Sequence, residues 1–220
     1  KKFIDEMVDW FTKAGNNGVP YALYQAGNIY RYGYYGRLEP NKEKMLALYQ
    51  QAGDKGYVPG YVTIADMYYQ GTKLIKQDYK EAKKWYQKAA EKSDPVAEFF
   101  LGEIASFKYV EESGDKEPLL VAKKWYEKSA NAGYGKAQYK LGMLLYSIQR
   151  DKEDIKNAYK WFQIAAIHSD HSQAVWSYQM LTLALTEEER NDIIEVAKAW
   201  KPTGVSEKHS EHKAEHKTEK

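Results

Sequence analysis

A repeated pattern of aromatic and small residues constrains the fold of this 220-residue chain more than any other feature. Five aromatic or apolar pairs recur along the sequence at steps of 38, 37, 40 and 36 residues. The pairs are Trp10-Phe11, Leu48-Tyr49, Trp85-Tyr86, Trp125-Tyr126 and Trp161-Phe162. A small residue follows the first member of each pair by four positions, and a glycine or serine follows it by eight. Self-similarity at this period predicts a repeat architecture in which each unit stacks on its neighbour.

A second set of small residues repeats between the aromatic pairs with the same irregular steps. Its members are Ala22, Gly60, Ala97 and Ala137, followed five positions later by Gly27, Ala65, Gly102 and Gly142. Residues such as Ala82, Tyr86 and Ala89 recur at spacings of three and four, which places them on one helical face. Each unit is therefore predicted to contain two antiparallel helices, in which small residues allow close approach and aromatic rings fill the remaining space.

Capping signals indicate where several of these helices begin. Asp78 with Glu81 matches a capping box, and it predicts a helix over residues 79–92. Asp94 stands before Pro95, a proline suited to a first helical turn, and predicts a helix over residues 95–107. Asn41 offers a cap for the helix that contains Leu48 and Tyr49.

The residues between these landmarks resemble the Sel-one-like repeat family, a branch of the tetratricopeptide superfamily. The match is closest in residues 78–90, Leu101-Gly102, residues 125–130 and Leu141-Gly142. A period of 36 to 40 residues favours this branch over the ordinary tetratricopeptide unit of about 34 residues. The resemblance covers roughly residues 3 to 200. It implies an all-α fold, namely a right-handed α/α solenoid of about four helix-pair repeats with a C-terminal capping helix.

Four segments follow from this resemblance. Residues 1–20 are expected to form the second helix of a partial N-terminal repeat, so we expect the natural protein to extend further toward its N-terminus. Residues 21–185 form the repeat array, and residues 186–200 form a capping helix that begins with a second capping box, Thr186 and Glu189. Residues 201–220 contain almost no apolar side chain and are expected to be a disordered, charged tail.

Composition and motifs argue against several classes of function. The formal net charge of +2 lacks the concentrated basic excess of a nucleic-acid-binding protein, and no apolar run is long enough to span a membrane. The chain has no cysteine, no phosphate-binding glycine loop and no nucleophile or metalloprotease motif. We therefore expect no enzymatic activity, no cofactor and no metal. Two groups of histidines have spacings that could bind a metal, but we expect neither to do so: His168 with His171, and His209, His212 and His216.

The first helices of the repeats carry the predicted binding residues. In this superfamily the first helices line the concave side of the array, and positions two, six and nine after the first small residue are expected to face it. The predicted partner-binding residues, which we call the first-helix surface, are Tyr24, Asn28, Arg31, Asp66, Tyr69, Phe99, Glu103, Tyr139, Met143 and Tyr146. Aromatic anchors with a few carboxylates suit a peptide, loop or helix that carries apolar residues and some positive charge.

Two other interpretations of these residues stay open. Phe99, Val62 and Met143 could complete the packing between neighbouring repeats instead of facing a partner. The tyrosine-rich segment 31–37 could form an exposed edge for a partner, since Tyr and Arg are enriched at interface hot spots.

The family resemblance implies a protein–protein interaction module, an adaptor or scaffold that binds its partner as a monomer. The alternative is an immunity protein that neutralises a secreted antibacterial effector toxin, and the partner would then be that effector or an envelope or secretion component. A weaker alternative is an enzyme of the cysteine-rich bacterial branch to which β-lactam binding is attributed, but this chain lacks the paired cysteines of that branch. Its location is expected to be the periplasm or the exterior if an N-terminal signal has been removed, and otherwise the cytoplasm.

Overall fold

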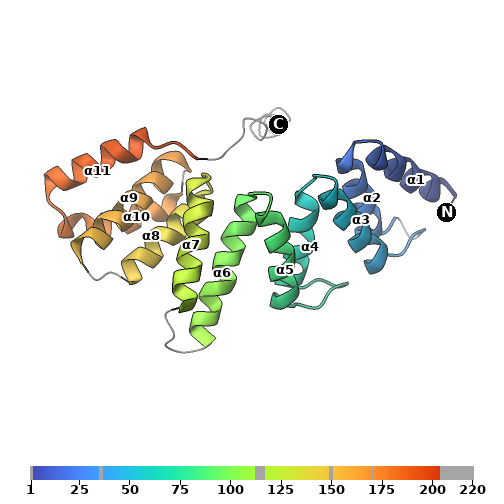
Figure 1. The fold of residues 1–220 in the computed structure, drawn as a ribbon, viewed down its shortest axis with the longest axis horizontal. Coiled ribbons are helices and arrows are strands. Elements are labelled where there is room, and N and C mark those ends of the chain that lie inside the picture. The colour runs from blue at the N-terminus through green and yellow to red at the C-terminus, as the bar shows by residue number, and fades with distance from the viewer. Residues whose placement is uncertain (1, 35–36, 112–116, 149–150, 170, 204–220) are drawn as a thin grey trace. The chain divides into compact units, whose positions relative to one another are not determined.

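A computed structural model describes residues 2–34, 37–111, 117–148, 151–169 and 171–203, and this part of the chain is almost entirely helical (Figure 1). The helices are α1 (Lys2–Asn16), α2 (Pro20–Tyr32), α3 (Lys42–Asp54), α4 (Pro59–Gln70), α5 (Tyr79–Ala90), α6 (Pro95–Glu111), α7 (Glu117–Asn131), α8 (Gly135–Ser147), α9 (Lys152–His168), α10 (Ser172–Leu181), the 3-10 helix η1 (Thr182–Ala184) and α11 (Glu187–Ala199). Within these ranges the only β-type pairing is a single bridge between Tyr34 and Leu38. The predicted all-α class is confirmed.

The chain divides into two compact units, Lys1–Ile104 and Ala105–Lys220, and the division falls inside α6. In the first unit α1 packs on α2, α2 on α3, α3 on α4, and α4 on α5. In the second unit α7 packs on α8 and α8 on α9, while both α10 and α11 pack on α9. Helices that follow one another in the sequence therefore form the pairs that the repeat predicts.

The predicted cap residues are present, but the Glu81 side chain pairs with Lys84 and does not complete the capping box predicted at Asp78, and two helices differ in length from the prediction. Asn41 accepts a hydrogen bond from the Lys44 backbone N–H at 2.9 Å, and Asp94 accepts one from Ala97 at 2.8 Å. Helix α5 ends at Ala90, before the predicted residue 92, because the chain already turns at Ser93. Helix α6 continues beyond the predicted residue 107 to Glu111, since no glycine or proline interrupts it there.

The glycine or serine of the repeat lies in the turn that leads from one pair to the next. Gly18, Gly56 and Gly133 have φ angles of 99°, 101° and 93°, and Ser93 has a φ of 57°. Such left-handed angles cost glycine little, which explains the landmark. Ser93 is the one non-glycine residue with a positive φ in the described ranges. The fifth member, Ser169, has a φ of −123° and does not share this conformation.

Inside each pair, the second helix places an aromatic ring against a small residue of the first helix. A Cβ atom on Gly27 would lie 2.6 Å from the ring of Tyr49, and one on Gly142 would lie 2.6 Å from the ring of Phe162. Both rings are buried. The second set of small residues is therefore required by the close approach of these rings, and a larger side chain would push the two helices apart.

The C-terminal helix α11 lies along α9 (Figure 1). His168 Nε2 lies 2.7 Å from the Ala197 carbonyl oxygen, and Trp200 packs edge-to-face against Trp161. At the other end, Lys152 and Lys156 both contact Glu189, at 2.9 and 3.0 Å. Helix α11 therefore covers the second helix of the last complete pair.

Candidate partner-binding surface

Two polar residues of the first-helix surface hold the hydroxyl groups of buried tyrosines from the second helix of their own pair. The Tyr49 hydroxyl donates a hydrogen bond to Asn28 Oδ1 at 2.6 Å, and the Tyr86 hydroxyl donates one to Asp66. The rings of Tyr49 and Tyr86 are fully buried. Asn28 and Asp66 therefore stabilise their helix pairs in addition to facing outward from them.

The third and fourth pairs vary this link. In the third pair the Tyr126 hydroxyl lies 3.2 Å from Ser106 Oγ. In the fourth pair Phe162 occupies the position of the tyrosine and has no hydroxyl, and Met143 occupies the position of Asn28 and Asp66. The residue type at this position of the first helix therefore matches the ring of the second helix. Where the buried ring lacks a hydroxyl, as in Phe162, the first helix carries an apolar side chain.

The charges of Arg31 and Asp66 act on each other and on the buried tyrosines. Burial raises the pKa of Asp66 above its ordinary value, while the hydrogen bond from Tyr86 and the positive charge of Arg31 oppose this rise. Burial also raises the pKa of Tyr49 to about 12, and Arg31 again opposes the rise. Arg31 therefore favours the ionised form of the half-buried Asp66 carboxyl group.

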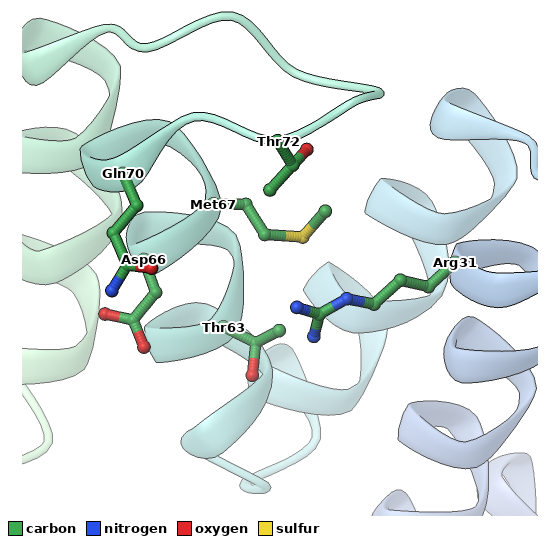
Figure 2. Close-up of a pocket in the computed structure, with 6 residues that line it drawn as sticks. All are labelled: Arg31, Thr63, Asp66, Met67, Gln70 and Thr72. Carbon is green, nitrogen blue, oxygen red and sulfur yellow. The ribbon is translucent and has the colours of Figure 1, made fainter.

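A hollow of about 160 Å³ lies in the first unit between α2 and α4. Six residues line it: Arg31, Thr63, Asp66, Met67, Gln70 and Thr72. Figure 2 shows the Arg31 side chain reaching from α2 toward α4, with Asp66 and Gln70 on the opposite wall and Met67 pointing toward Arg31 below Thr72. The hollow thus combines a guanidinium donor with carboxylate, amide and hydroxyl groups around an apolar floor.

Next to the hollow, Tyr24 belongs to an aromatic cluster. Its ring centroid lies 5.0 Å from that of Tyr49, 5.2 Å from that of Tyr57 and 6.3 Å from that of Tyr21. Its hydroxyl lies 3.3 Å from Thr63 Oγ1, at the wall of the hollow. Tyr24 is half-buried and Tyr21 is exposed, so the cluster forms a partly exposed aromatic surface.

The remaining predicted residues of the first unit differ in exposure. Tyr69 is half-buried and packs edge-to-face against Phe100, and burial together with the charge of Glu103 raises its pKa. Glu103 is half-buried as well. Phe99 is only 6% exposed and packs against Phe100, so it contributes mainly to the packing.

The three predicted residues of the second unit lie on α8. Tyr139 stacks on His171 with ring centroids 4.5 Å apart, while Met143 and Tyr146 are exposed. Burial lowers the pKa of His171. Because His168 contacts the Ala197 carbonyl and His171 stacks on Tyr139, the two histidines have separate partners. Among the positions that the structure describes, no group of three His, Asp or Glu side chains could hold a metal ion.

Some candidates fall partly or wholly outside the described residues. Tyr32, in the tyrosine-rich segment, is 70% exposed beneath the Arg31 guanidinium, but Tyr35 and Gly36 lie outside the described ranges. The tail histidines His209, His212 and His216 also lie outside them. The described helices include none that is long and apolar enough to cross a membrane.

The sequence reasoning missed one further first helix, α10. Ala174 lies 37 residues after Ala137, which is the period of the repeat, and it is fully buried like its counterparts. The same offsets of two, six and nine residues give Trp176, Met180 and Leu183. These side chains are 75%, 78% and 98% exposed. Continuing the count by one period would have found them.

The family comparison matches four segments of the chain. The model of the Sel1 repeat matches residues 20–57, 64–94, 95–134 and 135–170. These segments correspond to the helix pairs α2–α3, α4–α5, α6–α7 and α8–α9.

Similar proteins come from both fungi and bacteria. The chain is 30% identical over 166 residues to the chitin synthase regulator SKT5 of Saccharomyces cerevisiae. This alignment covers 74% of the present chain and 24% of the yeast protein. It therefore spans about a quarter of the length of this relative. A Sel1 repeat protein from Oxalobacter formigenes has a similar structure, with a TM-score of 0.58 and 24% identity over 89% of this chain and 79% of that one.

A protective antigen of uropathogenic Escherichia coli with an SLR fold matches with a TM-score of 0.63 and 23% identity over 86% of this chain and 39% of that one. At this level of identity the two solved structures show the fold alone. Together with the four matched segments, they confirm the predicted α/α solenoid class.

Proposed function

Because the chain belongs to the Sel1 repeat family, whose repeats are protein-interaction modules, we propose that it binds a partner protein through the first-helix surface of its first unit. The observation that carries this proposal is the hollow between Arg31 and Asp66, which lies beside the Tyr24 aromatic cluster. Scaffold proteins of this family are generally not enzymes, which agrees with a binding role.

The chemistry of the hollow defines the partner segment that we propose. A volume of about 160 Å³ corresponds to about five water molecules, which is room for one side chain or a short piece of extended backbone. Arg31 can donate hydrogen bonds, whereas Asp66 and Gln70 can accept them. An extended segment with a polar group in the hollow and an apolar side chain against Tyr24 would satisfy both surfaces.

A relative also supports a role exerted through another protein. The yeast relative is a chitin synthase regulator, and it is 30% identical to this chain over 166 residues. We propose only the general feature for this chain, namely action through a bound protein.

The test is a quantitative binding experiment with a charge variant and a matched control. The immobilised chain first captures a partner from the source cell's lysate, and the purified partner is then titrated against the variants. Arg31→Gln should weaken binding at least about tenfold, because truncating one member of a partly buried charged contact typically costs several kcal/mol. Lys83→Gln, at an exposed lysine on the second helix α5, should leave the affinity within about twofold.

Circular dichroism and thermal unfolding of both variants check that the fold is retained. Equal affinities for wild type and Arg31→Gln would contradict binding at the hollow. The identity of the captured partner then distinguishes an adaptor, which would retain an assembly component, from an immunity protein, which would retain a toxic effector. Both roles stay predictions until that partner is known.

A further inference from the structure

The outer face of α10 carries an apolar patch that is more exposed than the same positions of the preceding first helix, α8, where Met143 is 41% and Tyr146 42% exposed. We define the α10 patch as Trp176 and Met180 of α10 and Leu183 of η1, the 3-10 helix that continues α10; the three follow one another by four and three residues and so lie on one helical face. All three are at least 75% exposed. In the first unit, the positions two and six residues after Ala22 hold Tyr24 and Asn28. Both are half-buried and hydrogen-bonded to neighbouring helices.

The patch is exposed because α10 is not paired in the way of the earlier first helices. In those pairs a ring of the second helix packs against a small residue, as Phe162 does against Gly142. The equivalent position on α10 is Gln179, which is exposed. The next helix, α11, lies along α9 (Figure 1), so the outer face of α10 stays uncovered within the described chain.

The area of the patch matches that of the largest apolar patch on a typical monomer, which is often functional. Each of its side chains, when exposed to this degree, presents on the order of 150 to 200 Å², so the three together present on the order of 500 Å². Patches of this size commonly mark interaction sites. A self-association that buried the patch on two copies would remove about 1,000 Å² in total, which lies at the low end of specific interfaces and predicts a reversible dimer.

The charges around the patch favour a second copy of the chain. Residues 172–186 contain no charged side chain, although 29% of the whole chain is charged. Lys136 lies near His171 at the N-terminal end of α10, and Glu187 and Glu188 follow its C-terminal end. Arg190 also lies at this C-terminal end, where its guanidinium donates to the Thr182 and Leu185 carbonyls. Two α10 helices packed antiparallel would bring Lys136 of one copy toward Glu187 and Glu188 of the other and would oppose their helix dipoles.

We propose that the chain forms a symmetric homodimer in which the α10 patches of two copies pack antiparallel about a two-fold axis. A two-fold contact requires one self-complementary surface, and an uncharged apolar strip with opposite charges at its ends meets this requirement. This proposal replaces the monomer expected from the sequence. It uses no residue of the Arg31–Asp66 hollow, so it stands independently of the proposed partner binding.

The first test measures the oligomeric state of the full chain. Sedimentation equilibrium or light scattering from about 1 to about 200 µM should show a monomer–dimer equilibrium with a dissociation constant in the micromolar range. The double variant Met180→Glu, Leu183→Glu should weaken dimerisation at least about tenfold, because it places carboxylates in the apolar contact. Trp10→Glu, at a tryptophan of equal exposure on α1, is the matched control and should dimerise like the wild type.

A second test uses the absence of cysteine from the chain, because a single introduced thiol can then report one contact. Met180→Cys should form a disulfide between two copies under mild oxidation, since the centre of the patch lies near the two-fold axis. Trp10→Cys should remain largely monomeric under the same conditions.

A wild type that stays monomeric throughout this range, or a dimer unaffected by the double variant, would overturn the proposal. A monomer that pellets with phosphatidylcholine vesicles through the patch would overturn it in favour of a lipid surface.

Discussion

At the scale of single residues, the chain uses the same side chains for packing and for its outward surface. Asp66 accepts a hydrogen bond from buried Tyr86 and also lines the hollow. Burial raises the pKa of Asp66, which means that the ionised form is less favourable in the folded protein than in the unfolded one. Ionisation of Asp66 therefore lowers the free energy of unfolding at neutral pH, and the charge is favourable only if a bound partner interacts with it.

Substitution of Asp66 can separate these two roles. Asp66→Asn keeps an acceptor for the Tyr86 hydroxyl and removes the half-buried charge, so the free energy of unfolding at pH 7 should stay equal or rise. Asp66→Ala leaves the buried hydroxyl without this acceptor and should lose about 1 to 3 kcal/mol. Urea denaturation of both variants measures the difference, and equal losses would show that the charge itself stabilises the pair.

The buried Tyr49 hydroxyl predicts a loss of stability at alkaline pH. Its pKa is raised from 10.0 to about 12, so the folded state retains the proton that the unfolded state releases. The resulting stabilisation is complete below pH 10 and is lost as the pH rises through about 12.

Alkaline unfolding followed by circular dichroism measures this fall, and tyrosinate absorbance shows when the ring ionises. Tyr49→Phe removes the ionisable group, so its stability should fall less steeply over this pH range than that of the wild type. An equally steep fall in the variant would assign the effect to other tyrosines.

At the scale of elements, the turns between pairs explain why the repeat tolerates so few residue types at one position. Gly56 has a φ of 101°, and a Cβ atom there would meet nothing within 4 Å. The requirement for glycine is therefore purely conformational. At Ser93 the same kind of turn carries a side chain at a φ of 57°.

These two turns predict opposite responses to exchange. Gly56→Ala should lower the free energy of unfolding by about 1 to 2 kcal/mol, because an L-residue is strained at this φ. Ser93→Gly should not destabilise the protein and should stabilise it by up to about 1 kcal/mol, because it relieves the same strain. Denaturation midpoints at constant slope test both, and a large loss for Ser93→Gly would indicate that its side chain makes a needed contact.

The sequence predicted those elements that depend on local residues. Asp78 and Asp94 mark helix starts by their own side chains, and the period of small residues follows from rings that need space at positions such as Gly27. Features that depend on distant partners were not visible. The hydrogen bond from Tyr49 to Asn28 links residues 21 positions apart, and no pattern within one helix indicates it.

The candidate site was predictable to a similar extent. Counting positions identified Arg31 and Asp66, but not that they share one hollow or that Phe99 is buried. The α10 patch was missed because Gln179 replaces the glycine or alanine that marks the other first helices. The same replacement removes the small residue that marks a first helix and the space for a packed ring. The sequence repeat therefore ends at the helix that lacks a second-helix ring packed against it.

At the scale of the whole molecule, helix pairs contact mainly their neighbours, so damage to one pair should remain local. Tyr49→Ala removes a buried ring between α2 and α3, which should cost about 3 to 5 kcal/mol in that pair. Amide hydrogen exchange should show a loss of protection in α2, α3 and α4, with much less change in α8 and α9.

Phe162→Ala is the matched variant for the second unit. It should reverse the pattern, with the greatest loss of protection in α8 and α9. Equal loss of protection in all helices for either variant would show that the chain unfolds as one cooperative block.

The hydrogen bonds of the buried tyrosines also determine where such a chain can be cut and rejoined. The bonds of Tyr49, Tyr86 and Tyr126 each lie inside one matched repeat. Tyr61 differs, because its hydroxyl on α4 donates to Asp54 on α3, across the turn that contains Gly56. A segment exchanged between turns, for example from Gly56 to Ser93, would carry its ring, its acceptor and its outward-facing residues together. Recombination at these turns would therefore keep the bonds of Tyr49, Tyr86 and Tyr126 intact and would require an acceptor at the position of Asp54 in the preceding segment, whereas a junction inside a pair would separate the buried ring of that pair from its acceptor.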